Sequence, residues 1–565
     1  MNNLLDHWRH AIQNTPSIPG TLTTPAWSDD EVVVRLDNIS NEPLCPREWL
    51  LLDQPVAEPD WPIYGEGFQM LAQTAGSWGA PQPIGRCPDA EVYRITADEG
   101  YHTVHNLLMF KAQEQWTLLA FTGCERFGGE FRLFPDGRLQ VLMRTESVAL
   151  RPGSHWLSEP LLVMQGRQRG DLLARLAQRI ARHHPPVCAM ARPTGWCSWY
   201  HYYADVSADD IRENLQQIQQ RFPELRYVQI DDGYQAAMGD WLTPSDRFDG
   251  GLQPVVEAIH ASGAEPALWV APFIAEPGSR LFQDHPEWFI RDEHGQPLAA
   301  ETVTYGGWRC TPWYVLDGSH PEVQAHLSGL FSTLRHRFGI RYFKLDANFW
   351  GAIHGGKHHD PQATRISAYR RGMQAIIDGA GEGAFLLGCN APIWPSLGLV
   401  QGMRVADDIE RSGHRIRQVA REIFARSWQG ERLWQLDPDC LCLHDLSWQH
   451  ASQADYEFHM TTLLACGGMI LSGDRLRDLN PRQSQWLQML IRMAEGRAPA
   501  ADFCEDLSYG EMVFDGKRWS FFFNWHAEAQ RLVLPAGGEL ALYDAPAPDE
   551  YLLPPGGALV VTYRL

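Results

Sequence analysis

A short apolar segment, residues 340–346, carries the residue pair with the clearest chemical potential in this chain. Its β-prone run ends at Asp346, and Lys344 lies two positions earlier. Side chains at positions i and i+2 of a strand share a face, so we expect these two to project together. A buried acid and base at the end of a strand are unfavourable unless they are paired or used. The pair is therefore either a structural salt bridge or part of a chemical site.

The same kind of chemistry recurs at the ends of other β-prone segments. Carboxylates, one lysine, one arginine and several aromatic rings end these segments, and the residues are Tyr200, Asp231, Asp232, Trp269, Lys344, Asp346, Cys389, Asn390, Arg404, Asp407, Asp408, Ser472 and Asp474. One aspartate at a strand end can be structural, but several on different strands are hard to explain that way. Acids and aromatic platforms without metal-ligand histidines suit a polyhydroxylated substrate.

Two carboxyl groups are what the cleavage of a glycosidic bond requires, one as nucleophile and one as proton donor. Asp346 fits the nucleophile, because the Lys344 ammonium would keep its pKa low and the carboxylate ionised. The proton donor must stay protonated near neutral pH, which burial and a neighbouring negative charge favour. Asp408 has such a neighbour in Asp407, whereas Arg404 acts in the opposite direction. The direction of its pKa shift stays open on the sequence alone.

The segments that must position these residues alternate with helical stretches from about residue 190. Eight candidate strands follow one another, at residues 194–199, 226–231, 266–271, 340–346, 385–389, 402–407, 433–437 and 468–472. This alternation predicts an α/β fold, a (β/α)₈ TIM barrel over residues 190–495, whose active site lies at the C-terminal ends of the strands. An open doubly wound sheet is the alternative, but eight units and the lack of a glycine-rich phosphate loop disfavour it.

The regions on either side of the barrel read as β-structure. Short alternating runs separated by turns predict a large β-sandwich over residues 1–185, which ends in a helix at residues 171–183. After residue 496 the helical patterns cease, and runs such as 519–525 and 558–563 are strand-like. A small antiparallel β-domain over residues 496–565 is the expected C-terminal unit.

Charge and aromatic content narrow the class of partner. The chain has 48 Lys and Arg against 69 Asp and Glu, a formal net charge of −21. This balance disfavours nucleic acid and anionic membranes as partners and leaves a neutral small molecule open. With 22 Trp, 17 Tyr and 23 Phe, the chain has ample rings for stacking on sugar faces, although many will be ordinary core.

Cysteine usage and the N-terminus indicate the compartment. The eleven cysteines are scattered, and the Cys440–Cys442 pair has no second pair or histidine cluster at metal-ligand spacing. We therefore expect neither a disulfide scaffold nor a metal site, and no cofactor. The N-terminus lacks the pattern of a signal peptide, and no apolar run approaches about 18 residues. A cytoplasmic location is the resulting prediction.

Six segments of the barrel, in order, resemble those of a known family. They are GWCSWYHYY, YVQIDDGYQ, GDWL, FKLDANF, LLGCNAP and RVADD. In their residues, order and spacing these segments resemble those of glycoside hydrolase family 36, the bacterial α-galactosidases. The resemblance covers the whole barrel and fits the layout of a β-sandwich before it and a β-domain after it.

The resemblance implies a retaining, exo-acting hydrolysis of terminal α-galactosides from small oligosaccharides such as melibiose or raffinose, through a covalent galactosyl-enzyme. Asp346 matches the nucleophile, and Asp408 matches the acid/base because the family places it four residues after an arginine. Asp407 is the competing assignment for the acid/base. Further substrate contacts are implied for Asp231, Asp232, Lys344, Arg404, Cys389, Tyr200 and Trp269. The two aspartates of this set match the acidic pair that grips the 4- and 6-hydroxyls of the sugar.

Several alternatives stay open. The enzyme could act on another α-linked sugar, or transfer galactose to a second sugar as raffinose synthases do. The family often takes an aromatic side chain from the N-terminal domain. Trp61 or Tyr64 could supply it here, and ordinary packing within a strand is the alternative for both. The loop 350–359 could border the leaving-group site, with its histidines more readily explained by a solvated loop than by a metal. Cys389 would line the site rather than attack, and homo-oligomerisation is possible.

Overall fold

A parallel eight-stranded sheet forms the centre of the computed structural model, which describes residues 2–95, 100–187 and 191–565. The strand order is β22-β21-β20-β19-β16-β15-β14-β23. The strands are β14 (Thr194–Cys197), β15 (Tyr227–Ile230), β16 (Glu265–Val270), β19 (Tyr342–Leu345), β20 (Phe385–Gly388), β21 (Gly402–Arg404), β22 (Gln435–Asp437) and β23 (Ile470–Ser472). The two edge strands approach each other, because Met469 N donates to Leu436 O at 2.9 Å. The predicted TIM barrel is confirmed.

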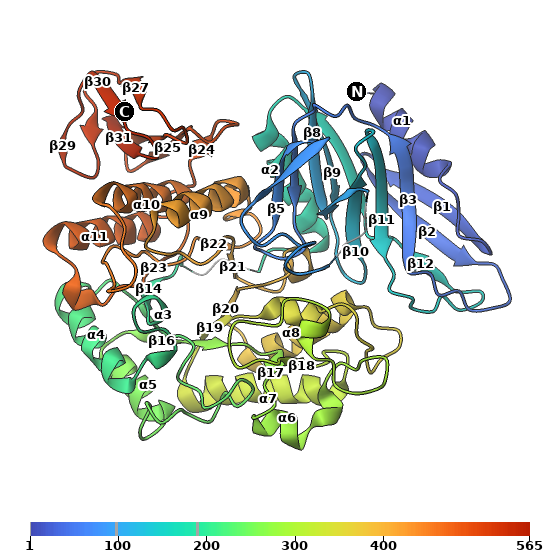
Figure 1. Ribbon diagram of the computed structural model, residues 1–565, viewed down its shortest axis with the longest axis horizontal. Helices are drawn as coiled ribbons and strands as arrows, with labels where there is room; N and C mark the ends of the chain where they lie inside the picture. Colours follow the sequence, from blue (N-terminus) through green and yellow to red (C-terminus); the bar gives the residue numbers. More distant parts are fainter. Residues whose placement is uncertain (1, 96–99, 188–190) are drawn as a thin grey trace.

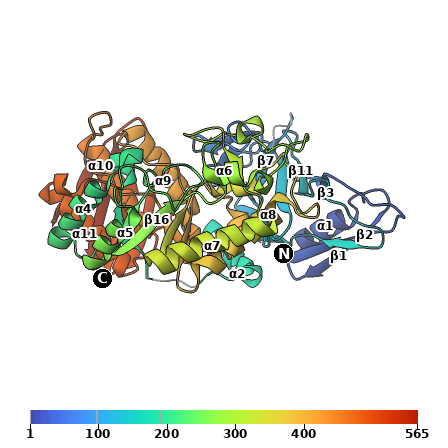
Figure 2. The same cartoon turned by 90° about the horizontal axis from the view of Figure 1, so that it is seen from below.

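Helices follow the strands and cover the outside of the barrel (Figures 1 and 2). They are α4 (Ala208–Arg221), α5 (Leu252–Ala261), α7 (Pro321–Phe338), α8 (Arg365–Ala380), α9 (Gly413–Arg426), α10 (Gln453–Cys466) and α11 (Pro481–Glu495). Helix α4 begins with a capping box, in which the Ser207 side chain accepts from Asp210 N and the Asp210 carboxylate accepts from Ser207 N. Its apolar face, with Ile211, Leu215 and Ile218, is buried as the periodicity predicts.

The connection from β20 to β21 lacks an α-helix and has only the short 3₁₀ turn Trp394–Ser396. The N-terminal region packs against this turn. Ile393 N donates to Phe68 O at 2.9 Å, and the Trp394 indole N–H donates to Phe121 O at 2.7 Å. The barrel therefore meets its N-terminal neighbour near the strands that end in Cys389 and Arg404 (Figure 1).

The N-terminal region consists of two antiparallel sheets, which confirms the predicted β-sandwich. The larger sheet has the order β1-β2-β13-β9-β8-β4-β5-β6, with β12 paired to β2, and the smaller has the order β3-β11-β10-β7. The strands are β1 (Thr21–Ser28), β2 (Glu31–Asn38), β3 (Glu48–Pro55), β4 (Ile63–Glu66), β5 (Gln73–Ser77), β6 (Ala80–Ile84), β7 (His102–His105), β8 (Leu107–Ala112), β9 (Gln115–Phe121), β10 (Gly128–Leu133), β11 (Arg138–Arg144), β12 (His155–Leu157) and β13 (Leu161–Gly166). Helix α2 (Arg169–His183) follows, as predicted.

A helix that the sequence analysis did not predict opens the chain, α1 (Asn2–Gln13). It packs on the sandwich core through Trp8, Ala11 and Ile12, which are buried together with residues of both sheets. The prediction of an all-β region up to residue 185 is therefore wrong for this stretch. The spacing of three to four residues between Trp8 and the other two is that of a helix with one buried face.

The C-terminal region is antiparallel, with a sheet of order β24-β25-β26-β31-β28-β29 and a separate pair β27-β30. The strands are β24 (Asp502–Phe503), β25 (Tyr509–Phe514), β26 (Lys517–Phe523), β27 (Gln530–Val533), β28 (Glu539–Leu540), β29 (Ala545–Pro546), β30 (Glu550–Leu553) and β31 (Ala558–Arg564). It lies on α9 and α10 (Figure 1), where Phe424 and Phe458 contact Phe523. The domain boundaries at 185, 190 and 496 stay predictions, and residue 190 lies outside the described residues.

None of the described helices combines the length and apolar character that crossing a membrane would need.

Candidate active site

A cavity of about 470 Å³ opens at the C-terminal ends of the barrel strands. Its lining includes six of the nine predicted site residues and the competing acid, namely Asp231, Asp232, Trp269, Lys344, Asp346, Asp408 and Asp407. The other three, Tyr200, Cys389 and Arg404, are buried beside these residues without lining the cavity. The predicted residues therefore come together at one cavity, where some line it and the others lie behind the lining.

Asp346 lies at the end of β19 and is held by three neutral donors. The Trp269 indole N–H donates to Oδ2 at 2.9 Å, while Asn390 Nδ2 and Ala347 N donate to Oδ1 at 3.0 and 2.7 Å. Ala347 adopts a left-handed backbone conformation with φ of 52°, which is unfavourable for a residue with a side chain. This strained turn follows the strand at once and brings the Ala347 N–H onto the carboxylate. Both carboxylate oxygens of Asp346 are thus fixed by hydrogen bonds at the cavity wall.

Lys344 lines the cavity as Asp346 does, but it is paired with a different acid. Its Nζ lies 3.0 Å from Asp231 Oδ2, and among the described residues no ion pair joins it to Asp346. Burial lowers the pKa of the Lys344 ammonium, but the negative charge of Asp231, supported by that of Asp346 and by nearby cysteines, outweighs it, and the pKa is raised. The structural salt bridge between Lys344 and Asp346, which the sequence left as an alternative, is therefore not formed, because the lysine reaches across the barrel interior to Asp231.

Asp231 and Asp232 follow β15 and are bound through separate partners. Gln229 donates to Asp231 Oδ2 at 2.7 Å, in addition to the Lys344 contact. Asp232 accepts from Gln235 at 2.6 Å and from Arg309, whose Nε lies 2.8 Å from Oδ2. The acidic pair is therefore fixed at the cavity with its charges compensated. Arg309 was not found from the sequence, and its 77-residue separation from Asp232 explains why.

Asp408 is held by a charge instead of by neutral donors. Arg404 Nη2 donates to its Oδ1 at 2.7 Å, and half of the Asp408 side chain is exposed. Burial raises the pKa of this carboxyl, but Arg404, Lys344 and Tyr200 together outweigh that effect, and the pKa is lowered. The structure thereby answers the question that the sequence left open.

Asp407 faces two arginines. Its Oδ2 accepts from Arg86 Nε and from Arg415 Nη1, each at 2.7 Å, and its Oδ1 accepts from Asp408 N at 2.8 Å. These guanidinium groups offset its charge, so it does not act on Asp408 as an uncompensated neighbour. Arg86 belongs to the N-terminal region, which therefore reaches the rim of the cavity.

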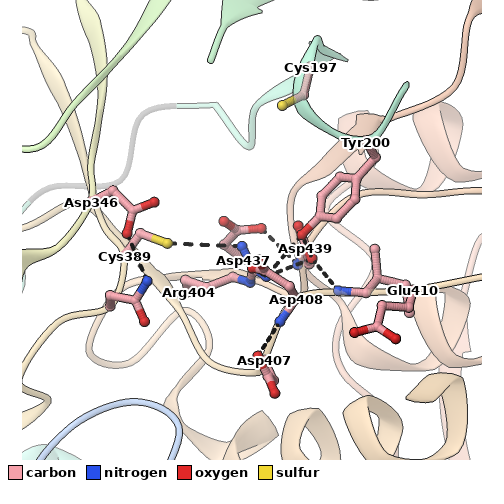
Figure 3. A network of polar contacts seen from close by, with 12 residues as sticks. Cys197, Tyr200, Asp346, Cys389, Arg404, Asp407, Asp408, Glu410, Asp437 and Asp439 are labelled. Atoms are coloured by element: carbon pink, nitrogen blue, oxygen red, sulfur yellow. Dashed lines mark hydrogen bonds and ion pairs between the residues drawn. The ribbon is translucent and has the colours of Figure 1, made fainter. Parts of the chain in front are cut away.

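Asp439, which the sequence analysis did not single out, completes the surroundings of Asp408. Its Oδ2 accepts from Arg404 Nη2 at 2.6 Å, from Ile409 N at 2.8 Å and from the Tyr200 hydroxyl. Burial raises the pKa of Asp439 to about 6. Figure 3 shows Tyr200, Asp408 and Asp439 around Arg404. Asp439 follows β22 by two residues, so the rule applied to the other strand ends could have found it.

Cys389 is buried next to Arg404, whose Nη1 lies 4.0 Å from its Sγ. Burial raises the pKa of this thiol well above its usual range. A protonated, buried thiol is a poor nucleophile, as expected, but Cys389 lies behind the cavity lining and not in it.

The aromatic side chain from the N-terminal region is Tyr93. It lines the cavity, and its ring centroid lies 4.7 Å from that of Phe349. For Trp61 and Tyr64, the alternative of ordinary packing holds. Tyr64 is buried with its hydroxyl 3.1 Å from Glu66, and Trp61 stacks on Phe110. Both belong to β4 or its start and pack within the N-terminal region, whereas Tyr93 lies in a connection that reaches the barrel.

The loop 350–359 provides no histidine to the cavity lining. Tyr305 and Trp308, from the preceding connection, line it instead. His358 pairs with Asp317 at 3.1 Å. Within the described ranges, no group of His, Cys, Asp or Glu is arranged to hold a metal ion.

Comparison with known proteins places these observations in a family. Residues 171–379 match the Melibiase family. The α-galactosidase C of Emericella nidulans is 27% identical over 250 residues, 40% of this chain and 31% of the relative. The α-galactosidase of Escherichia coli is 30% identical over 165 residues, 28% of this chain and 22% of the relative. The matches thus span less than a third of these curated relatives.

Solved structures share the fold over most of the chain. The α-galactosidase of Thermus thermophilus, in complex with p-nitrophenyl α-D-galactopyranoside, has a TM-score of 0.66 at 22% identity, covering 87% of this chain and 98% of that one. A GH36 α-galactosidase of Geobacillus stearothermophilus has a TM-score of 0.68 at 14% identity, covering 96% and 81%. At these identities the likeness shows the fold. Together with the sequence matches it confirms the resemblance to glycoside hydrolase family 36, to whose α-galactosidases this chain is similar.

Proposed function

We propose that this protein is an exo-acting α-galactosidase that hydrolyses terminal α-D-galactosyl residues from small oligosaccharides with retention of configuration. The observation that carries the proposal is the presence of Asp346 and Asp408, from different barrel strands, in the lining of one cavity. Two carboxyl groups across the scissile bond are the minimum equipment for this reaction. The Thermus thermophilus relative was solved with p-nitrophenyl α-D-galactopyranoside and with stachyose, which supports the substrate class.

The galactosyl unit would be held by the acidic pair and its partners. Asp231 and Asp232 can accept hydrogen bonds from sugar hydroxyls, and the Lys344 ammonium beside Asp231 can donate one. Trp269 offers an apolar ring surface in the same cavity. Because the counterions Lys344 and Arg309 hold these carboxylates in place, the sugar meets acceptors that are already positioned.

In the first step Asp346 attacks the anomeric carbon, and the bond between that carbon and the glycosidic oxygen breaks. Asp408 donates its proton to the departing oxygen, which leaves as an alcohol, and the galactosyl group stays on Asp346 as an ester. Arg404 makes Asp408 a stronger acid, because it stabilises the carboxylate formed by the proton transfer. Sugar binding removes water from the half-exposed Asp408 and so favours its protonated form before the transfer.

In the second step a water molecule attacks the same carbon from the side vacated by the leaving group. The Asp408 carboxylate takes a proton from that water, and the bond to Asp346 breaks. Galactose leaves with its original anomeric configuration, and Asp408 is protonated again. Trp269, Asn390 and Ala347 N stabilise the Asp346 carboxylate as it leaves, because all three donate to its oxygens.

Hydrolysis of p-nitrophenyl α-galactoside by the purified protein tests the proposal, with the α-glucoside and the N-acetyl-α-galactosaminide as controls for the sugar. Proton NMR of the first-formed product should show α-galactose. Normal binding of galactose with the galactoside left intact would refute the proposal. Product analysis at high acceptor concentration separates hydrolysis from transfer to a second sugar. The cytoplasmic setting stays a prediction, in accord with the ten described cysteines being free.

A further inference from the structure

Trp448 is an unusually exposed aromatic side chain close to the cavity. Its side chain is 63% exposed, and it is the only Trp among the strongly exposed large apolar residues of the described chain. It lies at the tip of a tight turn after β22, closed by Leu446 N donating to Gln449 O at 2.8 Å. A large ring held in water by an ordered turn has no role in the core of the protein.

The turn is fixed relative to the barrel by one buried side chain, Arg411. Its backbone N–H donates to Gln449 Oε1 at 3.3 Å, and its Nε donates to His444 O on the same turn. Its Nη1 donates to Tyr200 O at 2.8 Å, and its Nη2 pairs with Asp474 at 2.8 Å. One guanidinium therefore ties the Trp448 turn to the segment that follows β14.

Aromatic rings connect Trp448 with the cavity. Trp199 lines the cavity, and its ring centroid lies 5.1 Å from that of Tyr203. The Tyr203 ring lies 6.2 Å from the Trp448 ring. Tyr203 has a φ of 50°, in the left-handed region that strains a bulky residue. The fold tolerates this strain while placing the Tyr203 ring between the other two.

These rings lie on the side of the cavity where the leaving group would depart. Burial raises the pKa of the Tyr203 phenol, and the carboxylates of Asp408 and Glu410 are close enough to add to the effect. Trp199 also precedes Tyr200, whose hydroxyl lies 3.4 Å from Arg404 Nη2. The ring series therefore begins at Trp199, which lines the same cavity as Asp408, the proposed proton donor, and continues through Tyr203 to Trp448.

We propose that Trp199, Tyr203 and Trp448 form an aromatic track that binds the leaving-group part of longer α-galactosides, in which two or more neutral sugar units follow the scissile bond. Aromatic rings offer large apolar contact area at a low entropic cost, which suits the C–H faces of sugar rings. The acidic neighbours Asp408 and Glu410 disfavour anionic ligands at the same place. The inference rests on the proposed function and adds a preference for substrate length.

Substitution of Trp448 by alanine tests the track with stachyose and melibiose as substrates. We expect KM for stachyose to rise about fivefold relative to KM for melibiose with kcat unchanged, since the contact is equal in the ground and transition states. Trp448→Phe, which keeps a ring, should retain most of the preference. Leu552→Ala, at a side chain 67% exposed on the C-terminal β-domain, is the matched control and should change neither KM.

A ratio of the two KM values that stays constant in Trp448→Ala would overturn the track. So would a change in the mass of the protein by size-exclusion chromatography with multi-angle scattering, because Trp448 would then contact a second copy of the chain. If the unmodified protein cleaves neither sugar, the proposed function fails separately. In that case the aromatic track is tested by calorimetry on Asp346→Asn and on the double variant with Trp448→Ala. The track predicts that Trp448→Ala weakens the binding of stachyose more than that of melibiose, and equal effects on the two sugars would overturn it.

Discussion

The two proposed catalytic carboxylates have opposite surroundings. Asp346 is buried and accepts three hydrogen bonds from neutral groups of Trp269, Asn390 and Ala347. Asp408 is half exposed and is bound by Arg404, whose same nitrogen also binds Asp439. The first carboxylate is fixed by geometry, whereas the second is controlled by charge.

The difference matches the tasks of the two groups. A nucleophile needs a fixed direction toward one carbon, and several rigid donors provide it without adding a counterion. An acid/base must gain and lose a proton in each cycle, so its proton affinity has to respond to its surroundings. Sharing one guanidinium nitrogen between two carboxylates makes the affinity of Asp408 depend on the state of Asp439. Each site can be tested by a substitution that removes its own feature.

The largest effect is expected from Asp346→Ala, which removes the nucleophile. The value of kcat should fall by on the order of 10⁴-fold or more, because no other carboxylate can form the covalent ester. Added azide should restore turnover and give β-galactosyl azide, since the anion attacks the substrate directly. Circular dichroism and the melting temperature serve as controls for folding. Loss of stability without a specific loss of rate would show that Asp346 is a structural residue.

Asp408→Ala tests the charged side of the comparison. Its kcat/KM for melibiose should fall by about 10²- to 10⁴-fold, the range for removal of a general acid. The p-nitrophenyl galactoside should lose less in the glycosylation step, because its leaving group needs little protonation. Azide should here give the α-galactosyl product by attack on the ester. Asp407→Asn is the matched control variant and should lose less kcat/KM than Asp408→Ala. A larger loss in Asp407→Asn would assign the acid/base to Asp407.

Much of the barrel and its acidic residues followed from local patterns. Apolar β-prone runs marked the eight strands, and Asp346 and Asp408 stood out because each lies at or just beyond the C-terminal end of a strand. The hydrogen-bond and ion-pair partners of these residues were harder to predict from the sequence. Lys344 lies in β19 and Asp231 directly follows β15, and these two strands are separated in the sheet by β16. Side chains from alternate strands meet inside a barrel because the sheet closes on itself. The residue spacing within one strand does not reveal which side chains of other strands it will meet.

Residues from other parts of the chain were the hardest to predict. Tyr93 and Arg86 belong to the N-terminal region and line the cavity because that region packs at the β20–β21 connection. This connection has no hydrophobic periodicity from which the contact could have been predicted. Trp61 was one of two candidates named for its aromatic character, yet it packs against the core of the β-sandwich. Local patterns thus locate strand ends, while contacts between distant regions need the three-dimensional arrangement.

The smallest and sharpest effect is expected from Asp439→Asn. Ionised Asp439 repels the Asp408 carboxylate and competes for Arg404, so both effects raise the pKa of Asp408. Without that charge the pKa of Asp408 falls further, and less of it carries the proton that the first step needs. Because the pKa of Asp439 is about 6, the charge is present only above that pH.

The ratio of kcat/KM between the unmodified protein and Asp439→Asn should therefore be near one well below pH 6 and rise above it to about three- to tenfold, a shift of roughly half to one pKa unit. Asp437→Asn is the matched control, because Asp437 is a buried carboxyl of the same strand that accepts from Asp439 N at 2.9 Å. Its effect on the profile should be smaller, since it makes no hydrogen bond to Arg404 within the described residues. A ratio independent of pH, with an unchanged melting temperature, would show that Asp439 holds Arg404 in place without influencing the proton on Asp408.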